Sequence, residues 1–110
     1  LAITPTSLVA GAATPQFTTA ADVASTGTTA TTLATDIATA VAAQIVVDAT
    51  LWDSAGDTIS VTITGASVAG TGVSYIIQNQ AADTTYDAAA DTVIALIGTS
   101  VEPTVLAEFG

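Results

Sequence analysis

The 110-residue sequence has no lysine, arginine, histidine, cysteine or methionine. Without basic side chains the protein cannot neutralise phosphates and release their counterions, which excludes nucleic-acid binding through the backbone. A polybasic contact with an anionic membrane is excluded for the same reason. The lack of cysteine excludes disulfides and thiol chemistry. No apolar run reaches the roughly 18 consecutive residues that span a bilayer, and the first residues lack the basic region of a signal peptide.

The same absences remove most catalytic devices. Catalytic triads, Cys–His pairs, Schiff-base lysines and arginine clamps all need residues that this chain lacks, and a zinc site would have no His or Cys ligand. No P-loop or G-x-G-x-x-G run occurs. A carboxylate pair, as in glycoside hydrolases, would need a substrate cleft, usually floored by aromatic rings. With one Trp, two Tyr and two Phe in the whole chain, we predict that the protein is not an enzyme.

All of the side-chain charge is negative. Ten acidic residues give a net charge of −10, and no ion pair between side chains can form within the chain. The carboxylates must therefore be solvated, hydrogen-bonded by backbone N–H groups, bound to cations or matched by basic groups on another molecule. The length predicts one domain over residues 1–110. Because alanine supplies much of the apolar content, the core is modest, and assembly with copies of itself or with a partner would stabilise the fold.

Residues 28–64 contain the clearest structural pattern. Four apolar residues recur at every fourth position, as on one face of a helix: Leu33, Ile37, Val41 and Ile45. Thr28 or Thr29 is placed to cap the helix, whereas Asp36 and Gln44 fall away from the apolar stripe. We therefore predict a helix that packs through the stripe and leaves those two polar residues outside.

A β-hairpin is predicted directly after the helix. Residues 45–52 form the first expected strand, and the turn Asp53–Asp57 contains Gly56, which tolerates a positive φ. The second strand, 58–64, alternates Ile59, Val61 and Ile63 with Thr and Ser. We expect its apolar face to be buried against the helix and its hydroxyl face to be in water.

The segment after the hairpin contains one strand and one ambiguous stretch. Residues 65–72 are rich in Gly and Ala and predict a loop, and residues 73–79 predict a third strand. Residues 83–98 fit a helix capped by Asp83, or a hairpin, because the run TTYDAAADTVIALI mirrors the earlier run TLWDSAGDTISVTI. We favour the helix.

The two ends of the chain are predicted to be extended. Residues 1–27 contain Pro5 and Pro15 and no sustained period, and residues 99–110 cross Pro103. The predicted fold class is therefore α+β, with one or two helices on a small, mostly antiparallel sheet and with extended N- and C-terminal arms. The candidate interface residues are the large apolar side chains of these arms together with the tryptophan: Ile3, Leu8, Phe17, Trp52, Val105, Leu106 and Phe109.

Two groups of acids are candidates for a calcium site. Asp53 and Asp57, with Asp48 nearby, offer oxygen ligands of the kind that calcium prefers, and a second group is Asp83, Asp87 and Asp91. The spacing is not that of an EF-hand loop. The simpler interpretation is that Asp53 and Asp57 close a turn and that Asp83 caps a helix. We therefore predict no metal and no cofactor, and keep Asp53 and Asp57 as weak calcium candidates.

Two stretches resemble proteins of tailed bacteriophages. The opening LAITPTSLVAGA resembles the start of small phage structural proteins, and LATDIATAVAAQ followed by TLWDSAGDTISVTITGA is similar to helix-then-hairpin modules of phage head and tail components. The resemblance implies a virion structural protein, in particular a capsid decoration (cement) protein. Its expected partners are copies of itself and a major capsid protein. The alternatives are a phage tail component, or a subunit of an extracellular filament or surface layer.

Overall fold

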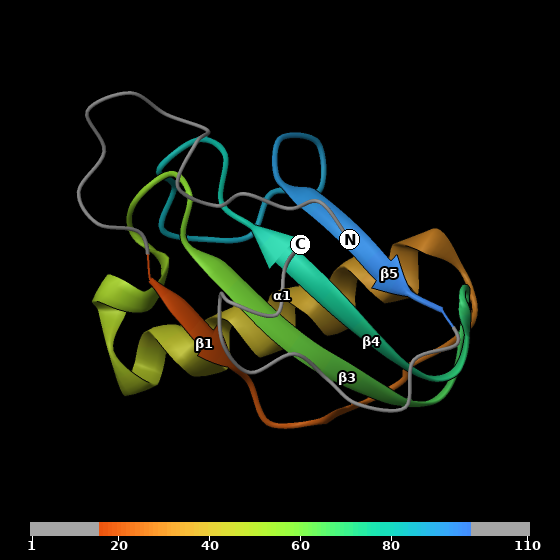
Figure 1. Cartoon of the computed structure of the whole chain (residues 1–110). Coiled ribbons are helices and arrows are strands. Elements are labelled where there is room, and N and C mark those ends of the chain that lie inside the picture. The colour runs from red at the N-terminus through yellow and green to blue at the C-terminus, as the bar shows by residue number, and fades with distance from the viewer. Residues whose placement is uncertain (1–15, 98–110) are drawn as a thin grey trace.

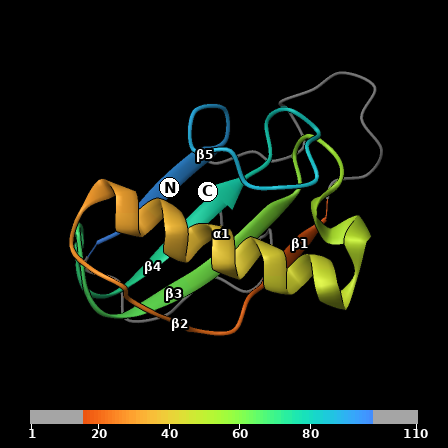
Figure 2. The ribbon, with the colours of Figure 1, turned by 180° about the vertical axis from the view of Figure 1, so that it is seen from behind.

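The computed structural model describes residues 16–97. In this range one α-helix packs on a sheet of five strands, which confirms the predicted α+β class (Figure 1). The helix crosses one face of the sheet, as the two opposite views show (Figures 1 and 2). In chain order the elements are β1 (Phe17–Thr19), β2 (Val23–Ala24), α1 (Ala30–Val47), the 3-10 helix η2 (Ala49–Trp52), β3 (Thr58–Ser67), β4 (Gly70–Gln78) and β5 (Thr92–Leu96).

The sheet is mixed, in the order β1-β3-β4-β5, with β2 also paired to β3. β1 and β2 run parallel to β3, so that Phe17 pairs with Thr58 and Val23 with Ile63. β3, β4 and β5 form an antiparallel meander. The described part of the predicted N-terminal arm is therefore part of the sheet. It lies at an edge of the sheet. A strand next to a proline such as Pro15 is tolerated there, because proline cannot donate a hydrogen bond to a central strand pair. The rest of that arm and the tail lie outside the described residues.

Helix α1 begins where the sequence predicted. Thr29 is the N-cap, and its hydroxyl and that of Thr32 each accept a hydrogen bond from the other residue's backbone N–H, which forms a capping box. The helix continues to Val47, however, so the predicted strand 45–52 is wrong. The four-residue apolar period runs on through Ile45, and no turn residue precedes Asp48. Asp48 ends the helix: its N–H donates to the carbonyl of Gln44, while its side chain caps η2.

The hairpin of the structure is therefore β3–β4. Ile59, Val61 and Ile63 face α1 and are fully buried, as predicted. The predicted loop 65–72 is instead the end of this hairpin, with an irregularity in strand pairing between Ile63 and Ala66, beside Gly65 at a φ of +81°. The predicted third strand, 73–79, is confirmed as the second part of β4.

The hydroxyl side of β3 does not face water along its whole length, which corrects the prediction. Thr58 and Ser60 are buried, and only at Thr64 does this side become exposed. The hydroxyls are bound within the sheet, as where Thr62 and Ser74 form a 2.8 Å hydrogen bond across β3 and β4. The hydroxyls on this face are therefore hydrogen-bonded within the sheet, and the buried Ile76, which pairs with Ser60, adds an apolar side chain to the same face.

The predicted helix at 83–98 is also wrong in its described part. Residues 83–91 form turns, and β5 follows. Two N–H groups that a helix would pair with backbone carbonyls donate instead to carboxylates: that of Asp87 to Asp91 and that of Ala89 to Asp87. Local side-chain acceptors of this kind compete with helix formation. The hairpin alternative is right only in that residues 92–96 form a strand.

The core lies between α1 and the sheet. Its largest fully buried members are Trp52, Tyr75, Ile37, Ile59 and Ile63. By length and composition alone α1 could cross a membrane, since its 18 residues have a mean hydropathy of 1.5. Here its inner face covers the sheet, and the residues buried there include Asp36, Ile37 and Val41.

Candidate functional site

Only two of the predicted interface residues lie among the described ones. Trp52 has no exposed surface and belongs to the core, so it is not available to a partner. Phe17 is half-buried in β1, where it pairs with Thr58 on the sheet face away from α1. The other five, which lie outside the described residues, are Ile3, Leu8, Val105, Leu106 and Phe109.

The weak calcium candidates form a tightly bonded turn. The Asp57 carboxylate is only 1% exposed. Its Oδ2 accepts the N–H groups of Asp53 (3.0 Å) and Ser54 (2.9 Å), and its Oδ1 accepts the N–H of Gln16 (2.9 Å). Asp53 is exposed and accepts a hydrogen bond from the Ser54 hydroxyl. Asp57 therefore joins the turn before β3 to the start of β1, with both carboxylate oxygens already bonded.

The second acid group forms the same hydrogen-bonding pattern before β5. Oδ2 of Asp91 accepts the N–H of Asp87 (2.8 Å), and Oδ1 accepts the N–H of Gln80 (3.0 Å). In each turn, the acid that directly precedes the strand accepts the N–H of the residue four positions earlier. It also accepts a second N–H from a neighbouring segment. The likeness between the two sequence runs extends to their hydrogen bonds. Within residues 16–97 no group of three or more acids is placed to hold a metal ion.

The sequence analysis did not identify two polar residues that join α1 to β1 and to the segment after β2. Asp36 is buried and accepts both the N–H (3.1 Å) and the hydroxyl (2.7 Å) of Thr26. Gln44 is also buried and accepts the Thr18 hydroxyl at 3.2 Å. The prediction that Asp36 and Gln44 face outward is wrong because their partners lie 10 and 26 residues away in sequence. The residues themselves gave no local signal of this pairing.

Two ionisable groups have shifted pKa values. Hydrogen bonds from the backbone N–H and the hydroxyl of Thr50 lower the pKa of the exposed Asp48 carboxyl below its ordinary 3.8. Burial, and then the negative charges of Asp91 and Asp87, raise the pKa of Tyr86 above its ordinary 10.0. At neutral pH Asp48 is therefore charged and the Tyr86 phenol is neutral.

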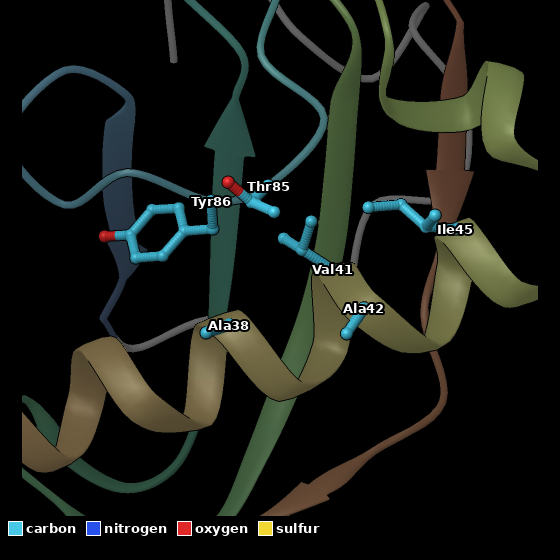
Figure 3. Close-up of a pocket in the computed structure, with 6 residues that line it drawn as sticks. All are labelled: Ala38, Val41, Ala42, Ile45, Thr85 and Tyr86. Carbon is cyan, nitrogen blue, oxygen red and sulfur yellow. The ribbon is translucent and has the colours of Figure 1, made fainter.

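A pocket of about 220 Å³ opens between α1 and the loop that precedes β5 (Figure 3). It is lined mostly by apolar atoms of Ala38, Val41, Ala42, Ile45, Thr85 and Tyr86. None of these six residues is an acid, and none of them is a base. The pocket is suited to an apolar side chain, and it provides no pair of groups for acid–base chemistry.

Comparison with known protein families, with curated proteins and with solved structures finds no match.

Proposed function

We propose that this protein is a non-enzymatic structural component of a virion, a decoration (cement) protein that docks on the capsid shell of a tailed bacteriophage. The observation that carries the proposal is the set of exposed acids. Asp36 and Asp57 are buried and Asp91 is half-buried, and each binds backbone N–H groups of the fold. Four others are exposed with no basic side chain in the chain to match them, although Asp48 and Asp87 each also accept one nearby backbone N–H: Asp22, Asp48, Asp53 and Asp87.

The exposed carboxylates explain why the proposed partner is a protein shell with a basic surface. Charges matched across an interface steer association and select the partner, and salt screens them over about 10 Å at 0.1 M. A shell presents many identical sites, and each is filled when the free concentration of this protein exceeds the Kd of a single contact. The resemblance of the N-terminal residues and of the 33–66 block to phage structural proteins supports the same choice.

Co-sedimentation with phage shells prepared without this chain tests the proposal. We expect the protein to pellet with the shells at low salt and to be released as the salt concentration rises. Replacing the exposed Asp48, Asp53 and Asp87 with Asn should weaken the binding, while replacing the half-buried Asp91 should chiefly affect stability. No binding at any salt concentration would rule out decoration.

One observation favours the alternative, a subunit of an extracellular filament or surface layer. β5 ends the sheet order within the described residues, where Leu96 already makes a further interaction, and its sequence TVIAL has neither the charge nor the proline that discourages pairing with another strand. Strand addition there would join copies head to tail. Electron microscopy separates the two functions, because a filament subunit forms fibres without shells and a decoration protein does not.

A further inference from the structure

The outward face of α1 carries no charged side chain. The only charged residue of the helix, Asp36, is buried against Thr26. The exposed residues are all Ala, Thr or Val: Ala30, Thr31, Thr35, Ala38, Thr39, Ala42, Ala43, Val46 and Val47. A helix at the surface of a soluble protein normally has charged residues on its outer side. In a chain of net charge −10, this face is a place where a second acidic molecule can approach without direct repulsion.

The threonines of this face are already hydrogen-bonded. The Thr35 hydroxyl donates to the carbonyl of Thr31 at 3.1 Å, and the Thr39 hydroxyl donates to the carbonyl of Thr35 at 3.0 Å. Burial of these two side chains would therefore leave no O–H donor unpaired, which removes the main cost of burying a hydroxyl. The face behaves as a more apolar surface than its composition indicates.

A projecting side chain and a recess lie on the same side of the helix. Val46 is 87% exposed. It follows Ala38 and Ala42 at four-residue spacing, and such residues lie along one side of a helix. Ala38 and Ala42 line the pocket together with Tyr86 (Figure 3). The recess, at about 220 Å³, has room for the Val46 side chain of a second copy.

We propose that the outward face of α1 is the interface of a homodimer, in which the two α1 helices pack antiparallel about a two-fold axis beside Ala42. An antiparallel pair centred on Ala42 places Ala38 of one copy opposite the partner's Val46. It also places Val46 of that copy opposite the partner's Ala38. Each Val46 then enters the pocket of the other copy, as a two-fold interface requires. The small residues at 38, 42 and 43 let the two helix backbones come close. This dimer goes beyond shell docking and does not depend on it.

Sedimentation velocity across a concentration series tests the dimer. We expect the mass to rise from the 10.7 kDa monomer toward twice that value, and more readily at high salt, where repulsion between the copies is screened. Ala42→Glu places two like charges face to face and should weaken dimerisation by at least about tenfold. Val68→Glu is the matched control, because Val68 is 50% exposed and belongs to the β3–β4 turn rather than to the outward face of α1. Trp52 fluorescence melts confirm that both variants fold.

Disulfide cross-linking locates the axis, since the chain has no cysteine of its own. Ala42→Cys should form a covalent dimer on mild oxidation, whereas Val68→Cys should stay mostly monomeric. A protein that remains monomeric at all concentrations would overturn the proposal, and so would a dimer indifferent to Ala42→Glu. Binding to phosphatidylcholine vesicles that is lost in Ala42→Glu, without dimerisation in solution, would assign the face to a membrane and overturn the proposal as well.

Discussion

Asp57 and Asp91 occupy equivalent positions in two turns that enter β3 and β5. Each carboxylate accepts the N–H of the residue four positions earlier, and each binds a second N–H, from Gln16 or from Gln80, in a neighbouring segment. In a chain without a basic side chain, these acids are held by backbone N–H groups. Hydrogen bonds to charged groups are stronger than those between neutral groups, so these turns are places where the fold gains stability from its acids.

The first prediction concerns Asp57. Asp57→Asn keeps the size of the side chain but replaces one acceptor oxygen with an NH₂ group that faces N–H donors. We expect a loss of about 3 kcal/mol in the free energy of unfolding, measured by urea denaturation with Trp52 fluorescence. Asp91→Asn, at a half-buried site with two N–H partners, should lose less. Asp22→Asn is the exposed control and should change stability by under about 0.5 kcal/mol. Equal effects at Asp57 and Asp22 would contradict this role.

Asp36 is predicted to hold α1 to the segment before it. Asp36→Ala removes the acceptor for both the N–H and the hydroxyl of Thr26, and we expect a loss of about 2–3 kcal/mol. Thr39→Ala on the exposed face of the same helix is the control and should be neutral or slightly stabilising, because Ala is the better helix former. Hydrogen exchange at the Thr26 amide offers a local readout, and protection there that survives Asp36→Ala would count against the contact.

Alkaline pH tests the environment of Tyr86. Its folded-state pKa is raised, so its contribution to stability is complete below about pH 10, the unfolded value, and is lost as the pH rises through the folded value. We expect Tyr86→Phe to flatten the decline in stability above pH 10. Phenolate absorbance reports both tyrosines of the chain, Tyr75 and Tyr86, so the difference between the wild type and Tyr86→Phe gives the titration of Tyr86. An identical decline in the variant and the wild type would contradict the assignment.

Trp52 is predicted to contribute through its volume rather than through its polar atom. The residue is fully buried, and within the described residues its Nε1 is the one buried side-chain nitrogen or oxygen with no hydrogen-bond partner. Trp52→Ala should lower the free energy of unfolding by about 3–5 kcal/mol. Trp52→Phe should cost clearly less, because it keeps most of the ring volume and removes the unpaired N–H. Circular dichroism melts measure both variants, and a Phe variant as damaged as the Ala variant would point to an unrecognised partner for Nε1.

The predictable parts of the fold were those set by neighbouring residues. The Thr29 cap and the alternation of Ile59, Val61 and Ile63 are local, and both were predicted correctly. The end of α1 was placed too early, since the β-branched residues Ile45, Val46 and Val47 have strand propensity although they continue the helix. Ile45 packs against the core from the helix, and such packing overrides strand propensity. The exposed Val46 and Val47 complete the last turn before the Asp48 cap.

The errors at residues 83–98 and on α1 came from interactions between distant or competing groups. The apolar period through Tyr86, Val93 and Ile97 fits a helix, but the carboxylates of Asp87 and Asp91 take N–H groups that a helix would use. Asp36 and Gln44 were placed outside because their partners, Thr26 and Thr18, become neighbours only in the folded chain. The parallel pairing of β1 and β2 with β3 is likewise non-local.

Zero-length carbodiimide cross-linking, read by mass spectrometry on particles that carry this protein, tests docking on a basic shell most directly. The reagent joins a carboxyl group to an amine, and this chain has ten acids and no lysine, so a link from one of its acids to a lysine must report another protein. We predict links from Asp48, Asp53 and Asp87 to lysines of the major capsid protein. Particles in which those acids form no link to any lysine, or link only to the α-amino groups of other copies, would contradict the proposed function.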